Sequence, residues 1–135
     1  MFRILVVDDE PAILGLLKSV LELASFEPHI ARSAAEAKTV LAQQSFDFVL
    51  TDMRMESVTA GFDVVRAARL LDPRPVIAIL TAFPMSPTEW RPSGADALMV
   101  KGADIISLPD KLINLFKAKP RTPRQPVAVR TNQSA

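Results

Sequence analysis

The chain of 135 residues has no cysteine and a single histidine. Without cysteine it can form no disulfide, and it offers neither a thiolate nucleophile nor a cysteine-ligated zinc site. His29 has no metal-binding partner in the sequence, so we expect it to be structural or exposed. Long uninterrupted apolar runs are also lacking, and no signal peptide is evident. These absences predict a soluble cytoplasmic protein with no membrane contact.

Charge is unevenly distributed along the chain. From Lys111 to the end there are six basic and no acidic residues, whereas the part before it has 10 basic and 15 acidic residues. Residues 119–135 are rich in Pro and poor in large apolar side chains, so burial cannot repay the entropy of ordering them. We predict one folded domain over residues 1–118 and a disordered, basic, Pro-rich tail over 119–135. The tail lacks interleaved aromatic residues and a recognition helix, which argues against a nucleic-acid partner.

Strands and helices are predicted to alternate along the domain. Short apolar runs predict strands at 2–7, 27–31, 47–52, 75–81 and 96–100. Apolar residues at helical spacing predict helices at 11–25, 33–44, 62–71 and 108–117. Five apolar strands alternating with helices indicate an α/β fold with a doubly wound parallel sheet covered on both faces.

The stretch "TAFPMSPTEWRPSG", 81–94, departs from this regular alternation. Ser86, Pro87 and Glu89 fit the start of a helix with a capping box. Pro92 would remove a backbone hydrogen bond and clash with the preceding turn. We therefore predict a shortened or irregular fourth helix of about one turn.

Polar side chains lie at the carboxyl ends of four of the predicted strands. Asp8 and Asp9 follow the first strand, Asp52 and Thr81 are the last residues of the third and fourth, and Lys101 follows the fifth. Ligand sites of such folds lie beyond the carboxyl ends of the strands. Carboxylates brought together repel one another, so a cation should lie among them, and oxygen ligands favour Mg²⁺. With a lysine and a hydroxyl, this set is suited to holding a phosphoryl group.

Each of these side chains also has an ordinary structural interpretation. An Asp after a strand commonly caps the next helix, and the "DDE" before Pro11 could serve that purpose alone. Thr81 could merely end a strand, and Lys101 could be a surface charge. Their joint occurrence at four strand ends is what favours a site.

Four motifs in order resemble the receiver domain of bacterial two-component response regulators. They are "ILVVDDEP", "FDFVLTDMRM", "ILTA" and "GADALMVK". The resemblance covers residues 1 to about 118 and points to a stand-alone, single-domain member of the family. It implies a flavodoxin-like receiver fold with five parallel strands in the order 2-1-3-4-5.

The resemblance also implies the role of each metal ligand. Asp52 would accept a phosphoryl group from a phosphohistidine on a sensor histidine kinase or phosphotransfer protein. Asp9 would bind Mg²⁺ directly and Asp8 through water, together with Asp52 and the backbone carbonyl of Arg54.

The remaining implied roles concern the binding of the phosphoryl group and the contacts through which the protein would pass on the signal. Thr81 and Lys101 would hold the phosphoryl oxygens. Phosphorylation would control contacts with a downstream protein, with a second copy of the chain as one candidate. No enzymatic activity beyond self-phosphorylation and self-dephosphorylation is expected.

Several positions depart from the family pattern. Leu98 replaces the aromatic residue that usually switches on phosphorylation, and Gly102 replaces the Pro that usually follows the Lys. Glu56 stands where Pro is common, in a loop that looks one residue longer than usual and is therefore expected to be more mobile. The positions that set the phosphoryl lifetime are Arg54 and Phe83, and neither is suited to orienting a water molecule.

Two other functions remain open from the sequence. Leu98 and Gly102 favour a degenerate receiver that binds partners without phosphorylation. A phosphatase with an aspartyl nucleophile would usually have a second acid two residues after Asp52, where this chain has Arg54.

Overall fold

Five parallel strands form one sheet in the computed structural model, which describes residues 1–118. The strand order is β2-β1-β3-β4-β5, as predicted. The strands are β1 (Phe2–Val7), β2 (Phe26–Ala31), β3 (Phe48–Thr51), β4 (Val76–Thr81) and β5 (Ala97–Val100). The predicted doubly wound α/β fold is confirmed.

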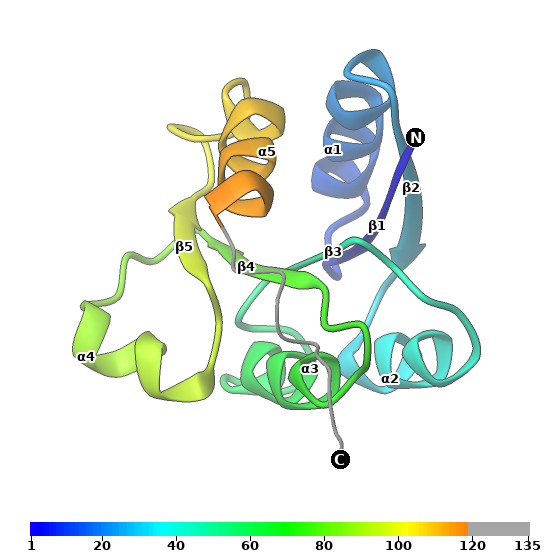
Figure 1. Cartoon of the computed structure of the whole chain (residues 1–135). Coiled ribbons are helices and arrows are strands. Elements are labelled where there is room, and N and C mark those ends of the chain that lie inside the picture. The colour runs from blue at the N-terminus through cyan, green and yellow to red at the C-terminus, as the bar shows by residue number, and fades with distance from the viewer. Residues whose placement is uncertain (119–135) are drawn as a thin grey trace.

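Helices cover both faces of the sheet (Figure 1). α1 (Pro11–Leu23) and α5 (Leu108–Ala118) lie on one face, and α2 (Ala34–Gln43) and α3 (Ala60–Arg69) on the other. Every residue of β4 is buried, because a strand covered on both sides needs apolar residues without alternation. The continuous apolar runs of the sequence are therefore the signature of this three-layered arrangement.

The fourth helix is short, as predicted. α4 (Pro87–Trp90) spans 4 residues and is followed by a 3-10 turn, η1 (Arg91–Ser93). The carboxylate of Glu89 accepts a hydrogen bond from the backbone N–H of Ser86 at 2.9 Å, which is half of the predicted capping box. Pro92 falls within η1, where an α-helix would have to continue.

Some element boundaries differ from the predictions. The helix predicted at 62–71 begins at Ala60 and ends at Arg69. Ala60 is fully buried, but a small side chain contributes little to apolar periodicity, so the pattern missed it. The helix predicted at 11–25 ends at Leu23, because Ser25 adopts a left-handed φ of 67°.

Residues 119–135, for which the sequence predicts a disordered tail, lie outside the described residues. Within residues 1–118, no helix is long and apolar enough to span a bilayer.

Gly61 allows α3 to approach the segment that follows β3. Its N–H donates to the carbonyl of Met53 at 2.8 Å. A Cβ placed on Gly61 would lie 2.4 Å from the carbonyl oxygen of Asp52 and 2.7 Å from the Cα of Met53. Both neighbours are backbone atoms, so they cannot move aside cheaply. The absence of a side chain at Gly61 thus sets the position of the segment that carries Asp52.

We predict that Gly61→Ala lowers the free energy of unfolding by about 1–3 kcal/mol, the usual cost of overpacking. The matched control is Gly15→Ala, because Gly15 is exposed in α1 and has no atom within 4 Å of an added Cβ. This control should raise stability by about 0.5–1 kcal/mol through helix propensity. Urea denaturation of the three proteins measures both effects, and equal changes for the two variants would contradict the steric argument.

Candidate functional site

The acidic side chains lie where the central strands end. Asp8 follows β1, and its N–H donates to the carbonyl of Ala31 at the end of β2 at 3.1 Å. Asp52 follows β3, and its N–H donates to the carbonyl of Val7 at the end of β1 at 2.8 Å. These bonds continue the parallel ladder one residue beyond the strands. The backbone of the sheet therefore fixes both Asp residues.

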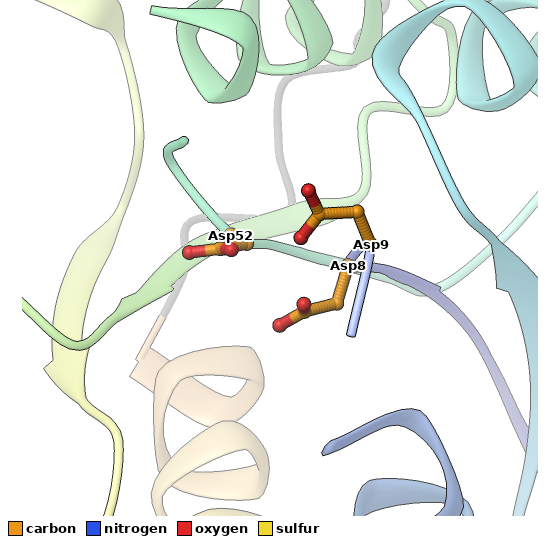
Figure 2. Close-up of side chains that lie close together, drawn as sticks. All are labelled: Asp8, Asp9 and Asp52. Carbon is orange, nitrogen blue, oxygen red and sulfur yellow. The ribbon is translucent and has the colours of Figure 1, made fainter. Parts of the chain in front are cut away.

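Three carboxylates meet at this edge. Asp8, Asp9 and Asp52 each offer an oxygen, and these oxygens lie within 4.8 Å of one another. Figure 2 shows Asp8 and Asp9 side by side and facing Asp52. Asp8 and Asp52 are 1% and 8% exposed, whereas Asp9 is exposed. A divalent cation at this cluster would thus contact two buried carboxylates and one exposed carboxylate, and it would be open to solvent on the exposed side.

One oxygen of each buried carboxylate is already paired with the backbone. Oδ1 of Asp8 accepts from the N–H of Glu10 at 2.9 Å, and Oδ1 of Asp52 accepts from the N–H of Met53 at 2.8 Å. The second oxygen of each group points to Lys101. Each carboxylate is therefore oriented by its own loop and presents one oxygen to a cation.

Lys101 is the cation that the structure places among these carboxylates. Its Nζ lies 2.7 Å from Oδ2 of Asp8, 3.2 Å from Oδ2 of Asp52 and 3.2 Å from Oε1 of Glu10. The N–H of Lys101 donates to the carbonyl of Thr81 at 2.8 Å, which fixes the residue at the end of β5. Burial acts to lower the pKa of Lys101, but hydrogen bonding to Asp8 and attraction to Asp52 outweigh it, so the pKa is raised.

The pKa of Asp52 is raised in this environment. Burial is the main cause, repulsion from Asp8 adds to it, and Lys101 opposes both. Because the folded state binds this proton more tightly than the unfolded state, the contribution of Asp52 to stability falls as the pH rises above 3.8, its ordinary pKa. At neutral pH the ionised Asp52 is therefore a cost to the fold, which a cation among the carboxylates would relieve.

The donor set fits a hard divalent cation. It consists of carboxylate oxygens only, and two of the three groups are buried with a net negative charge that one lysine does not fully compensate. Oxygen ligands of this kind select Mg²⁺, Ca²⁺ or Mn²⁺ over softer metals. The acidic cluster therefore has the chemistry of a divalent metal site.

Thr81 lies at the end of β4 and is 2% exposed. Its Oγ1 accepts a hydrogen bond from the N–H of Phe83 at 3.2 Å. The N–H of Lys101 bonds to its carbonyl, so the ends of β4 and β5 are joined through Thr81. The hydroxyl and the lysine that the sequence singled out are thus held by neighbouring strand ends.

Arg54 and Phe83, the two positions predicted to set the phosphoryl lifetime, are in contact. The guanidinium carbon of Arg54 lies over the Phe83 ring, 4.6 Å from its centroid, which is a cation–π geometry. Phe83 is 57% exposed, so this stack lies at the surface. The stack links the segment after Asp52 to the segment after Thr81.

The two other departures from the family pattern have simple local geometry. Leu98 in β5 is partly buried and packs against the cluster of apolar side chains between the sheet and α2 and α3. The peptide bond between Lys101 and Gly102 is trans, since the cis bond among residues 1–118 is Asp72–Pro73. Gly102 has a φ of 89°, a left-handed conformation that favours glycine.

Two acidic residues, one at the site and one on the loop after Asp52, were not predicted as site residues. Glu10 is bound to Lys101, and its place in "DDE" was a signal that could have found it. Glu56 accepts hydrogen bonds from the first residues of α2. No local pattern indicates this second contact, because its partners lie 22 and 21 residues away.

Comparison with known proteins relates this geometry to a family. Residues 4–113 match the family model of the response regulator receiver domain. The response regulator protein PilR of Pseudomonas aeruginosa is 37% identical over 81 residues, which are 60% of this chain and 18% of PilR. The chain spans about a fifth of the length of the first curated relatives that it matches.

Solved structures of similar fold include one with a ligand and one with a partner. The response regulator TrrA of Thermotoga maritima, in complex with Mg²⁺-BeF, is 31% identical with a TM-score of 0.75, covering 85% of this chain and 99% of TrrA. TrrA in complex with the histidine kinase ThkA gives a TM-score of 0.74 at 31% identity, covering 85% of this chain and 98% of TrrA.

Proposed function

The chain belongs to the response regulator receiver domain family, and from this membership we propose that Asp52 is its phosphoacceptor. The donor is a phosphohistidine on a sensor histidine kinase or a phosphotransfer protein. An oxygen of Asp52 forms a bond to phosphorus while the bond from phosphorus to the histidine nitrogen breaks, and the electron pair leaves with the imidazole. The observation that carries the proposal is the placement of Asp52 at the end of the central strand, beside Asp8, Asp9 and Lys101.

Mg²⁺ is the proposed cofactor. The residues that would hold it are Asp9, Asp8 through water, Asp52 and the backbone carbonyl of Arg54. When bound, the ion supplies positive charge for the carboxylates and for the phosphoryl oxygens. The chemistry of the three carboxylates supports this assignment, as does the Mg²⁺-BeF complex of TrrA.

Thr81 and Lys101 are proposed to hold the phosphoryl group. The ammonium of Lys101 already faces an oxygen of Asp52 at 3.2 Å and can exchange this contact for a phosphoryl oxygen. The hydroxyl of Thr81 can donate to another oxygen, because its one hydrogen bond among residues 1–118 is accepted from the N–H of Phe83. Catalysis then consists mainly of positioning and charge neutralisation.

The output is proposed to be a protein contact controlled by phosphorylation, in the cytoplasm. The downstream protein, or a second copy of this chain, would contact a face altered by the short α4. We expect no enzymatic activity beyond the gain and loss of its own phosphoryl group.

A degenerate receiver is the second candidate. Leu98 in place of an aromatic residue and Gly102 in place of Pro favour it, while the intact acidic cluster opposes it. A phosphatase is disfavoured because Arg54 occupies the position of the second acid. Phosphorylation of the purified protein separates these functions.

We predict that the protein gains one phosphoryl group when incubated with Mg²⁺ and a small phosphodonor. Intact-mass spectrometry measures the gain. The gain should disappear in Asp52→Asn and in the presence of a chelator, because the acceptor oxygen or the compensating charge is then missing. The control is Asp63→Asn, which alters a partly exposed Asp on α3 and should be labelled like the parent. Labelling of Asp52→Asn would overturn the assignment, and an unlabelled parent would favour the degenerate receiver.

We also predict slow self-dephosphorylation. The stack of Phe83 and Arg54 places an apolar ring and a cation at the positions from which a water molecule would be oriented. Phe83→Glu should remove the stack, add an acceptor for water and speed the loss of phosphate at least on the order of tenfold. The decay of the phosphorylated mass with time measures the rate.

The control for this prediction is Leu70→Glu, because Leu70 is an exposed apolar residue at the end of α3. This variant should lose phosphate at the parental rate. A Phe83→Glu protein that is no faster than the parent would refute the role of the stack.

A further inference from the structure

We propose that Glu56 is a positioning residue for the metal site: it ties the loop after Asp52 to the start of α2. The inference rests on the proposed function, since the loop contains Arg54, whose carbonyl is a proposed metal ligand. Glu56 itself contacts neither the acidic cluster nor Lys101 among the contacts of the described residues. Its action is therefore through the loop.

The tie consists of two hydrogen bonds from the start of α2 to the carboxylate of Glu56. Oε1 of Glu56 accepts from the N–H of Ala34 at 3.0 Å, and Oε2 accepts from the N–H of Ala35 at 3.1 Å. These donors belong to the first turn of α2, where backbone N–H groups have no partner within the helix. Both oxygens of one carboxylate are used, and the charge lies at the positive end of the helix dipole. The hydrogen bond from Ala34 is the main reason why the pKa of Glu56 is lowered.

The segment that leads into α2 also contacts the other half of the proposed metal site. The carbonyl of Ala31, at the end of β2 and three residues before α2 begins, accepts from the N–H of Asp8 at 3.1 Å. The segment from Ala31 to Ala35 is therefore bonded on one side to the loop with Asp8 and on the other to the loop with Asp52. This segment thereby sets the distance between Asp8, on the loop after β1, and the loop that carries Asp52 and Arg54.

Arg54 lies between two anchors of its own loop. On one side, the carbonyl of Met53 accepts from the N–H of Gly61 at 2.8 Å. On the other side, Glu56 is bound to α2. A carbonyl between two fixed points has few directions available. Loss of the Glu56 anchor would remove one restraint on the backbone of Arg54, while the stack on Phe83 and the positions of Asp52 and Met53 would remain.

This tie also gives a physical reason for a departure from the family pattern. Receivers usually have Pro where this chain has Glu56, and the ring of Pro restricts the backbone. In this chain, two hydrogen bonds from one carboxylate to a helix supply the restriction from outside the loop. The greater mobility expected from the length of the loop stays a prediction, and Glu56 is the residue that would limit it.

A simple helix cap is the competing explanation, and the chain contains a matched control for it. Glu36 also caps α2: its Oε1 accepts from the N–H of Arg32 at 2.7 Å, and its N–H donates to Oγ of Ser33 at 3.0 Å. Among residues 1–118, Glu36 makes no hydrogen bond or ion pair with the loop after Asp52. Removing either carboxylate weakens the same end of α2, but only Glu56 joins that end to the metal loop.

The test compares Glu56→Ala with Glu36→Ala in the full unphosphorylated chain. Isothermal titration calorimetry measures the Kd for Mg²⁺, thermal unfolding measures Tm, and hydrogen exchange without metal measures protection of amides 54–58. Glu56→Ala should raise the Kd about tenfold, as loss of an outer-shell partner does, and should speed exchange in this loop. Glu36→Ala should lower Tm to a similar degree but leave the Kd and the exchange of the loop unchanged. If Glu56→Ala is poorly folded, Glu56→Gln replaces it, with a smaller rise in Kd because one neutral acceptor remains.

Two results would overturn the inference. One is an unchanged Kd and unchanged loop exchange in Glu56→Ala. The other is an equal rise in Kd for both variants, which would reduce Glu56 to a helix cap. Failure of the proposed function is distinguishable, because it would appear as a parent protein that is not phosphorylated, while the exchange of the metal-free loop would still test the tie.

Discussion

The contact of the Lys101 ammonium with the buried carboxylates of Asp8 and Asp52 is the interaction on which this site depends. Two carboxylates at 1% and 8% exposure would repel each other strongly without a cation between them. The Nζ of Lys101 lies 2.7 Å from Oδ2 of Asp8 and 3.2 Å from Oδ2 of Asp52, and it compensates part of this charge. Because Lys101 stands at the end of β5, the fold itself brings it to the carboxylates. The remaining negative charge gives the cluster the chemistry of a divalent cation site, and under the proposed function the ammonium exchanges a carboxylate contact for a phosphoryl oxygen.

The parallel sheet brings these groups together because its hydrogen-bond ladder continues beyond the strands. The N–H groups of Asp8, Asp52 and Lys101 each donate to a carbonyl at the end of a neighbouring strand. Apolar residues on both faces hold the strands, and the close approach of Gly61 sets the segment after Asp52. The costly polar cluster is therefore supported by backbone bonds that cannot shift without disturbing the core.

The sequence predicted the parts of this arrangement that follow from local pattern. The five strands, the short α4 and the placement of Asp8 and Asp52 at strand ends need only apolar runs, proline positions and the geometry of parallel sheets. The bond from Glu56 to α2 and the stack of Arg54 on Phe83 join segments that are distant in the sequence, so no local spacing indicates them. The early start of α3 was missed because its first residues are too small to show a period.

The most direct test of this account is the pKa of the Asp52 carboxyl, measured by carbon-13 NMR in metal-free parent protein and in Lys101→Met. The account predicts that the pKa is raised in the parent and raised further in the variant, because Lys101 opposes the effects of burial and of Asp8. Addition of Mg²⁺ should lower the pKa in both proteins. A pKa in Lys101→Met that equals or falls below the parental pKa would contradict the central role of this ion pair.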